Sequence, residues 1–234
     1  MRRGWILRGL TIAAAVAFAV VAYAYLTLPD VRDLATTNPR TTAFMTLREA
    51  EAASEGRKLR HLHQWVRYSR ISKNLQRAVL VAEDSRFFEH EGVDLEELKK
   101  SIEINIERGG AIRGGSTITQ QLAKNLYLSP SKNPIRKLRE LIITRRIEAA
   151  LSKARILEIY LNVIEWGDGV YGAEAAARTY FKKSASDLNA SEAAYLAAMI
   201  PSPLNVFNPK KNPKRLARRQ KIILRGMNSI QLKY

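Results

Sequence analysis

Cysteine is absent from the 234 residues of the chain, so disulfide bridges, thiolate metal sites and cysteine nucleophiles are excluded. A chain without cysteine fits an oxidising compartment as well as a reducing one. Histidine occurs three times, and because His61 and His63 have no further ligands beside them, we expect no zinc site. Glycine and proline number only 12 and 8 against 46% hydrophobic residues, which excludes a disordered or collagen-like protein.

Acidic residues are also scarce, with 22 Asp and Glu against 39 Lys and Arg, so the formal net charge is +17. Such an imbalance indicates an anionic partner: a nucleic acid, a phospholipid surface or a phosphorylated substrate. The length favours one principal domain. Strand-like alternation is rare and no internal repeat occurs, whereas helical spacing of apolar residues dominates from residue 74 onward. The fold class is therefore expected to be mainly α.

Charge is missing altogether from residues 9–28, which follow Arg2, Arg3 and Arg8. About 20 helical residues span roughly 30 Å, the thickness of a bilayer core. With the arginines on the cytoplasmic side, this run predicts a single transmembrane helix and an exported domain. The alternatives are a cleaved signal peptide, since residues 22–24 have a small-x-small pattern, and a buried helix. Export removes nucleic acid from the expected partners and leaves lipid and lipid-linked phosphate.

The predicted organisation has three parts. Residues 1–28 form the cytoplasmic basic end and the anchor, residues 29–72 a linker or membrane-proximal segment, and residues 73–234 the main domain. Helix starts in the main domain are indicated by capping residues. These are Asp94 with Glu97, Asn189 with Glu192, and Asn133 and Asn212, each before a proline.

Glu83 and Asp84 follow an apolar helix expected over residues 75–82. A carboxylate at a helix C-terminus opposes the helix dipole, and apolar neighbours add desolvation, so its pKa should be raised. A raised carboxylate pKa suits a general base near neutral pH. The alternative is a solvated acidic pair at a helix end.

Glu140 is preceded at helical spacing by Arg136 and Lys137. The three residues form either an ordinary intrahelical ion pair or a site for a sugar phosphate. Ser116 is a candidate N-cap after a glycine-rich stretch. The exposed N–H groups of that helix, with Lys124, would then bind an anion.

Residues 94–113 combine an apolar stripe with basic flanks. The stripe is Leu95, Leu98, Ile102 and Ile106, with Ile112 beyond it, and the basic residues are Lys99, Lys100, Arg108 and Arg113. Such a helix can lie in a membrane interface. The alternative is that the stripe packs on the core.

Five segments, taken in order, resemble the five motifs of the peptidoglycan glycosyltransferases. They are residues 83–92, 115–125, 136–140, 156–162 with Gly167 and Gly172 beyond, and 197–203 with Asn208 and Pro209. The resemblance covers about residues 73–228. The short chain is similar to the monofunctional biosynthetic transglycosylases, and not to the bifunctional penicillin-binding proteins. The resemblance implies a mainly α, lysozyme-like glycosyltransferase domain that follows one N-terminal transmembrane helix and lies on the outer face of the bacterial cytoplasmic membrane.

The resemblance further implies that the protein polymerises lipid II into linear β-1,4 glycan strands, with inversion, and releases polyprenyl diphosphate. Glu83 would be the general base, and Glu140 would orient the acceptor or the cations. Lys124, Arg136 and Lys137 would stabilise the diphosphate. The other substrate-binding residues implied are Asp84, Ser116, Thr117, Gln121, Asn125, Tyr160 and Asn162.

No cofactor is expected to be obligatory, and a divalent cation such as Mg²⁺ at the diphosphate stays open. The expected partners are lipid II, the lipid-linked glycan chain, membrane lipids and proteins of cell-wall synthesis. Two other functions remain: a lysozyme-like glycan hydrolase or lytic transglycosylase, which also uses two carboxylates, and a non-catalytic cell-wall scaffold. The cations beside the second carboxylate and the expected anchor favour the synthase.

Overall fold

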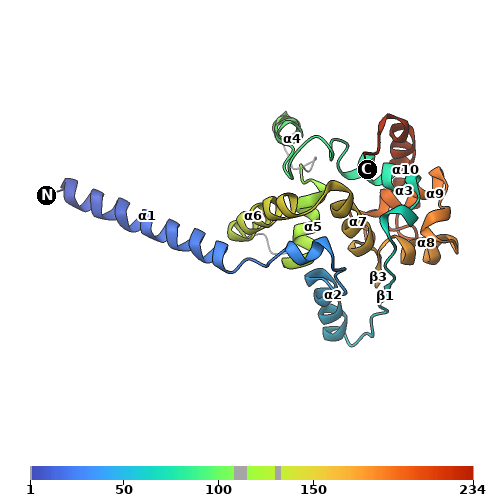
Figure 1. The fold of residues 1–234 in the computed structure, drawn as a ribbon, viewed down its shortest axis with the longest axis horizontal. Helices are drawn as coiled ribbons and strands as arrows, with labels where there is room; N and C mark the ends of the chain where they lie inside the picture. The colour runs from blue at the N-terminus through green and yellow to red at the C-terminus, as the bar shows by residue number, and fades with distance from the viewer. Residues whose placement is uncertain (1, 108–114, 130–132, 234) are drawn as a thin grey trace.

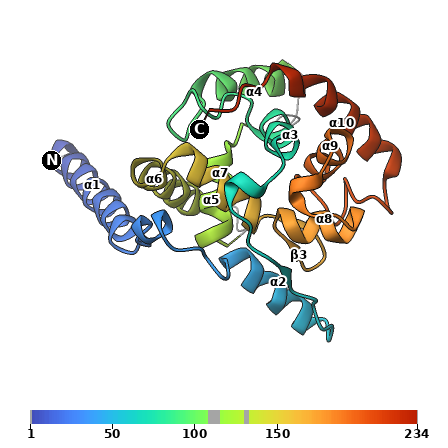
Figure 2. The same ribbon diagram turned by 45° about the vertical axis from the view of Figure 1, so that its right-hand side comes forward.

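The structure, a computed structural model, describes residues 2–107, 115–129 and 133–233. One long helix, α1 (Arg2–Leu26), extends away from the other elements, which gather in one domain (Figures 1 and 2). The helices of the domain are α2 (Ala43–Ser54), α3 (Lys73–Glu83), α4 (Leu95–Glu107), α5 (Ile118–Tyr127), α6 (Pro134–Ala150), α7 (Lys153–Val163), α8 (Ala173–Phe181), α9 (Ala190–Met199) and α10 (Pro213–Gly226). Short 3₁₀ turns are η1 (Arg32–Ala35), η2 (Tyr68–Arg70), η3 (Ala185–Asp187) and η4 (Met227–Ser229). The mainly α prediction is confirmed.

Helix starts agree with the capping signals in the sequence. Asn133 and Asn212 are the N-cap residues of α6 and α10, each followed by proline, and Asn189 forms a capping box with Glu192 at α9. The Glu97 amide donates to the Asp94 carboxylate at 2.9 Å ahead of α4.

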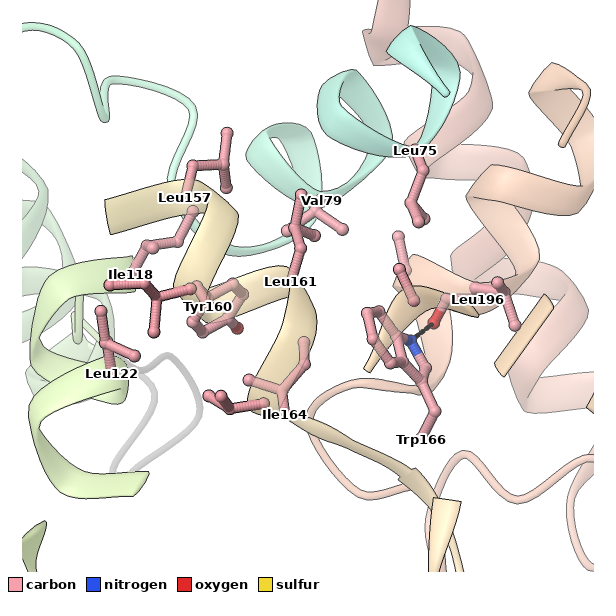
Figure 3. Packing of buried hydrophobic residues seen from close by; sticks show 14 of the residues in the cluster. Leu75, Val79, Ile118, Leu122, Leu157, Tyr160, Leu161, Ile164, Trp166 and Leu196 are labelled. Atoms are coloured by element: carbon pink, nitrogen blue, oxygen red, sulfur yellow. Dashed lines mark hydrogen bonds between the residues drawn. The ribbon is translucent and has the colours of Figure 1, made fainter. Parts of the chain in front are cut away.

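The hydrophobic core lies where α7 meets α3, α5 and α9. Figure 3 shows Tyr160 of α7 beside Leu122 of α5, with Val79 contributed by α3. Trp166 is fully buried, and its indole N–H donates to the Leu196 carbonyl oxygen of α9 at 3.0 Å (Figure 3). This bond satisfies the one polar atom of the largest buried side chain, so its apolar surface is buried without an unpaired donor.

Residues 29–72, expected as a linker or membrane-proximal segment, contribute residues to the core of the domain. Leu34 and Met45 are buried in the common core, and α2 runs along the lower edge of the domain in Figure 2. Arg155 of α7 fastens the start of this segment, because its guanidinium donates to the Leu34 carbonyl and to the Asn38 side chain, both at 2.8 Å.

A small sheet connects this segment to the rest of the domain. Its strands are β1 (Leu62–His63), β2 (Glu165–Gly167) and β3 (Val170–Tyr171), in the order β1-β3-β2, with β1 parallel and β2 antiparallel to β3. Asn162 holds the chain beyond β1. Its side-chain oxygen accepts from the Val66 amide at 2.8 Å, and its amide donates to the Val66 carbonyl at 2.9 Å. The Asn162 side chain is therefore fully buried and bound to backbone, and its placement in the substrate cleft stays a prediction.

Across the described residues, none of the helices combines the length and the apolar character that crossing a bilayer requires. The end of α1 contacts α6, where Arg139 donates to the Thr27 carbonyl at 3.2 Å and the Arg146 guanidinium lies 4.5 Å from the centre of the Tyr25 ring. The transmembrane anchor stays a prediction from the sequence.

The apolar stripe of α4 faces outward. Leu95, Ile102 and Ile106 are 71%, 50% and 75% exposed, and Leu98 is 38% exposed. The alternative that this stripe packs on the core is therefore wrong. Arg108, Ile112 and Arg113, which the sequence placed beside it, lie outside the described residues.

Two glycines share a left-handed backbone but have different surroundings, and they provide a test of the sheet. At Gly169 (φ +69°) a Cβ would lie 1.6 Å from the Arg60 carbonyl oxygen, whereas at Gly56 (φ +67°) no atom lies within 4 Å. Left-handed backbone costs an L-residue about 1–2 kcal/mol. We expect Gly56→Ala to lower the melting temperature by a few degrees and Gly169→Ala to lower it clearly more, because the Arg60 backbone must also move. Equal melting temperatures for the two variants in a calorimetric scan would contradict this account.

Candidate active site

Two cavities meet at Glu83. The larger, of about 560 Å³, is bounded by the end of α3, the residues before α5 and one face of α10. The second, of about 400 Å³, is bounded by α2, α5, β2 and residues 200–205. Both are lined by Glu83, Ser116, Gln121 and Pro201. A single carboxylate therefore faces two adjoining spaces.

Glu83 is the last residue of α3, because the backbone of Asp84 leaves the helical region at φ −166°. Its side chain is 9% exposed. One carboxylate oxygen accepts from the Gln121 amide at 2.9 Å, and the other accepts from the Arg219 guanidinium at 3.0 Å. Burial raises the pKa of the Glu83 carboxyl, while Gln121, Arg219 and Lys124 oppose that rise. The direction agrees with the expectation from the sequence, with desolvation as the largest cause.

Tyr160 acts on this carboxylate through Gln121. The phenol O–H donates to the side-chain oxygen of Gln121 at 2.8 Å, which directs the Gln121 amide toward Glu83. Burial raises the pKa of Tyr160 well above its ordinary value, so the phenol stays a neutral donor. The Tyr160 side chain is fully buried and orients Gln121, which lines both cavities; the substrate contact implied by the resemblance stays a prediction.

Both carboxylate oxygens of Asp84 accept hydrogen bonds from other residues of the protein. Its side chain is 3% exposed, and its two oxygens accept from the Ile118 amide at 3.0 Å and from the His90 ring at 2.9 Å. These bonds join the end of α3 to the start of α5. Asp84 also lines the larger cavity, so the substrate contact implied by the resemblance stays a prediction beside this structural role.

The start of α5 does not form the expected anion site. Thr117, and not Ser116, is the N-cap residue, and it forms a capping box with Gln120. The Ile118 and Gln120 amides donate to Asp84 and Thr117, so N–H groups of the first turn already have partners. The Thr117 hydroxyl donates to the Gly92 carbonyl at 2.6 Å. Thr117 lines the larger cavity, and Ser116 lines both.

Lys124 and Asn125, one turn further along α5, line the second cavity. Burial lowers the pKa of the Lys124 ammonium, and the charge of Glu140 opposes that shift. The Asn125 side-chain amide donates to the Gln121 carbonyl at 2.8 Å, which leaves its side-chain oxygen for other partners.

Glu140, Arg136 and Lys137 form a cluster on α6. The Glu140 side chain is 5% exposed and accepts from the Arg136 guanidinium at 2.7 Å and from the Lys137 ammonium. None of the three is among the residues that line the two described cavities. They reach the site electrostatically, because the charges of all three act on the pKa of Lys124.

Arg219 is the residue of the site that sequence reasoning missed. It stands in a basic run on α10 and matches no motif, yet it binds Glu83 and lies over the Phe207 ring at 5.3 Å. A signal was present: Arg219 lies three and four residues from Leu216 and Ile223, the buried residues of α10. A basic residue on the buried face of a helix indicates an acidic partner.

Within the described ranges, no group of three or more His, Cys, Asp or Glu residues is arranged to hold a metal ion. Asp84, the carboxylate next to Glu83 in the chain, directs both of its oxygens at protein donors. A divalent cation at a bound diphosphate is a property of the substrate complex and stays a proposal.

Comparison with known proteins identifies the family. The family model described as Transglycosylase matches residues 56–228. The chain is 47% identical over 230 residues to a biosynthetic peptidoglycan transglycosylase of Thiobacillus denitrificans, covering 98% of both chains. Proteins of the same name from Laribacter hongkongensis and Aromatoleum aromaticum are 49% and 54% identical over 195 and 166 residues, which cover 83% and 71% of this chain and 85% and 72% of theirs. The chain therefore belongs to the transglycosylase family of the biosynthetic peptidoglycan transglycosylases, and it is a glycosyltransferase.

Proposed function

We propose that this enzyme polymerises lipid II into linear β-1,4 glycan strands and releases polyprenyl diphosphate. The observation that carries the proposal is the buried Glu83 carboxylate, with its raised pKa, at the junction of two cavities. Joining two saccharides requires a base between an acceptor and a donor, and this arrangement supplies one. The names of the relatives support the same substrate class.

In the proposed reaction, Glu83 takes the proton of the acceptor sugar 4-hydroxyl, and that oxygen bonds to the anomeric carbon of the donor. The bond from this carbon to the diphosphate oxygen breaks on the opposite face, so the configuration is inverted and the electron pair leaves with the diphosphate. Gln121 and Arg219 hold the two oxygens of Glu83, which fixes the base toward both cavities.

Lys124 supports placing the donor diphosphate in the second cavity, since its buried ammonium lines that space. Positive charge there would stabilise the leaving group as its charge develops. Arg136 and Lys137 would extend this field from α6, with Glu140 holding both in place. A Mg²⁺ ion carried by the diphosphate is compatible with this arrangement, and no cofactor is required by it.

The contacts of Glu140 argue against a glycan hydrolase. A two-carboxylate hydrolysis needs a second carboxyl group that is free to act as acid or nucleophile. Both Glu140 oxygens instead accept from cations, one from Arg136 and one from Lys137. Glu140 is also not among the residues that line the two described cavities, so it is not placed as the second carboxylate of a hydrolase.

We further propose that the enzyme works at the outer face of the bacterial cytoplasmic membrane, because its substrate carries a polyprenyl chain. The anchor rests on the uncharged run of residues 9–28 in the sequence. The exposed apolar stripe of α4 supports a second contact with lipid, beside Lys99 and Lys100.

Replacing Glu83 by Gln tests the base. The substitution keeps the shape and the bond to Arg219 but removes the group that accepts a proton. We expect polymerisation of purified lipid II, followed by sizing of the glycan, to fall about 10²- to 10⁴-fold. Asp187→Asn, a change at a short 3₁₀ turn outside both cavities, serves as the control. Polymerisation by Glu83→Gln at the wild-type rate would remove Glu83 from the mechanism.

Removing the Arg219 charge tests the electrostatics. The base must be deprotonated, so the acidic limb of the pH profile of kcat/KM follows the pKa of Glu83. Arg219 opposes the rise in this pKa, so Arg219→Gln should raise the pKa further and move the acidic limb to higher pH. Arg215→Gln, which removes a charge on the same helix and cavity wall, should leave the limb in place. Equal profiles for both variants would contradict this account.

The membrane contact is tested with a chain that begins at Pro29. We expect it to bind vesicles containing anionic phospholipid, and less so at high salt. Changing Ile102 and Ile106 to Ser should reduce this binding with little change in melting temperature, because both side chains are exposed. Loss of thermal stability with unchanged vesicle binding would mean that these side chains are used within the protein.

A further inference from the structure

Helix α2 forms one wall of the second cavity. Phe44 and Arg48 line this cavity from α2, and Glu165 lines it from β2. The family match begins at residue 56, so α2 lies outside it. A wall of the space beside the base is therefore built by residues that precede those matched by the family model.

Arg48 joins this wall to the sheet. Its guanidinium donates to both oxygens of Glu165, at 3.0 and 3.1 Å, in a bidentate pair, and its third nitrogen donates to Glu51 at 2.8 Å. The same guanidinium lies 4.8 Å from the centre of the Phe44 ring. The Arg48 and Glu165 side chains are 28% and 6% exposed. Such paired, shielded hydrogen bonds are stronger than exposed ones and are directional.

Glu165 has no evident structural reason to be acidic except this pair. It opens the strand that continues into Trp166 at the centre of the core, and its burial raises the pKa of the carboxyl, which Arg48 opposes. A buried carboxylate on a core strand is costly unless it is paired. Its position at the edge of the second cavity points to a requirement of the site and not of the core.

The location of the pair indicates what it controls. Helix α2 packs against α5, the helix that carries Gln121, Lys124 and Asn125. Lys124 of α5, Arg48 of α2 and Glu165 of β2 thus line the same cavity. The distance between these walls sets the width available to a ligand beside the base.

We propose that Arg48 and Glu165 are positioning residues that hold α2 against β2 and so set the width of the donor cavity for the saccharide next to the diphosphate. The proposal rests on the proposed function. Loss of the pair would loosen α2 while leaving Glu83, Gln121 and Arg219 in place, so donor binding should weaken more than the chemical step.

The test measures KM and kcat for lipid II with the full chain in detergent. We expect Arg48→Ala and Glu165→Gln each to raise KM about tenfold and to change kcat much less, because the base is untouched. The double variant should be no worse than either single variant, since both remove one interaction. Arg48→Lys should recover only part of the loss, because an ammonium cannot form the bidentate pair.

Arg57→Ala is the matched control. Arg57 also connects the chain after α2 to the β2–β3 turn, through an ion pair with Asp168 at 3.4 Å, but neither residue lines the second cavity. It should leave KM unchanged. Equal KM values for Arg48→Ala, Glu165→Gln and Arg57→Ala, or a loss confined to kcat, would overturn the proposal. Failure of the wild-type chain to lengthen glycan from lipid II would instead overturn the proposed function.

Discussion

The burial of the Glu83 carboxylate is the constraint on which the site depends. A charge in a poorly hydrated position is costly unless fixed polar groups replace its water. Gln121 and Arg219 do this here, each binding one oxygen. Because neither neutralises the desolvation fully, the pKa of the carboxyl stays raised. The same balance lets one side chain be stable in the fold and still accept a proton.

Holding those partners in place accounts for much of the surrounding architecture. Asp84 accepts a hydrogen bond from the first turn of α5 and so connects that turn to the end of α3. The neighbouring residue Glu83 thereby faces Gln121 of α5. Tyr160, buried on α7, fixes the orientation of the Gln121 amide. α10 packs on α3 and α9 and brings Arg219 back from near the end of the chain. Three helices distant in sequence thus converge on one carboxylate.

Positive charges at and near the site are likewise paired with buried carboxylates. Lys124 stands at the cavity, whereas Arg136 and Lys137 are held behind it by the buried Glu140. A cation cluster without a counter-charge would repel itself, and Glu140 removes that repulsion while keeping the net charge positive. At the second cavity, Glu165 pairs with Arg48 and so offsets the charge of that guanidinium.

The sequence by itself determined the helical class, most helix starts, and the residues whose chemistry is expressed locally. Local features depend only on neighbours a few residues away, so they can be predicted from the sequence. Examples are the capping at Asn133 and Asn189 and the apolar helix ahead of Glu83. The tertiary structure alone decided which polar residues are exposed. Asn162 and Tyr160 belong to motifs but are buried, and Arg219 and Arg48 belong to none but reach the site. The reason is physical: burial and ion pairing depend on residues more than 100 positions apart, as in the bonds from Arg219 to Glu83 and from Arg48 to Glu165.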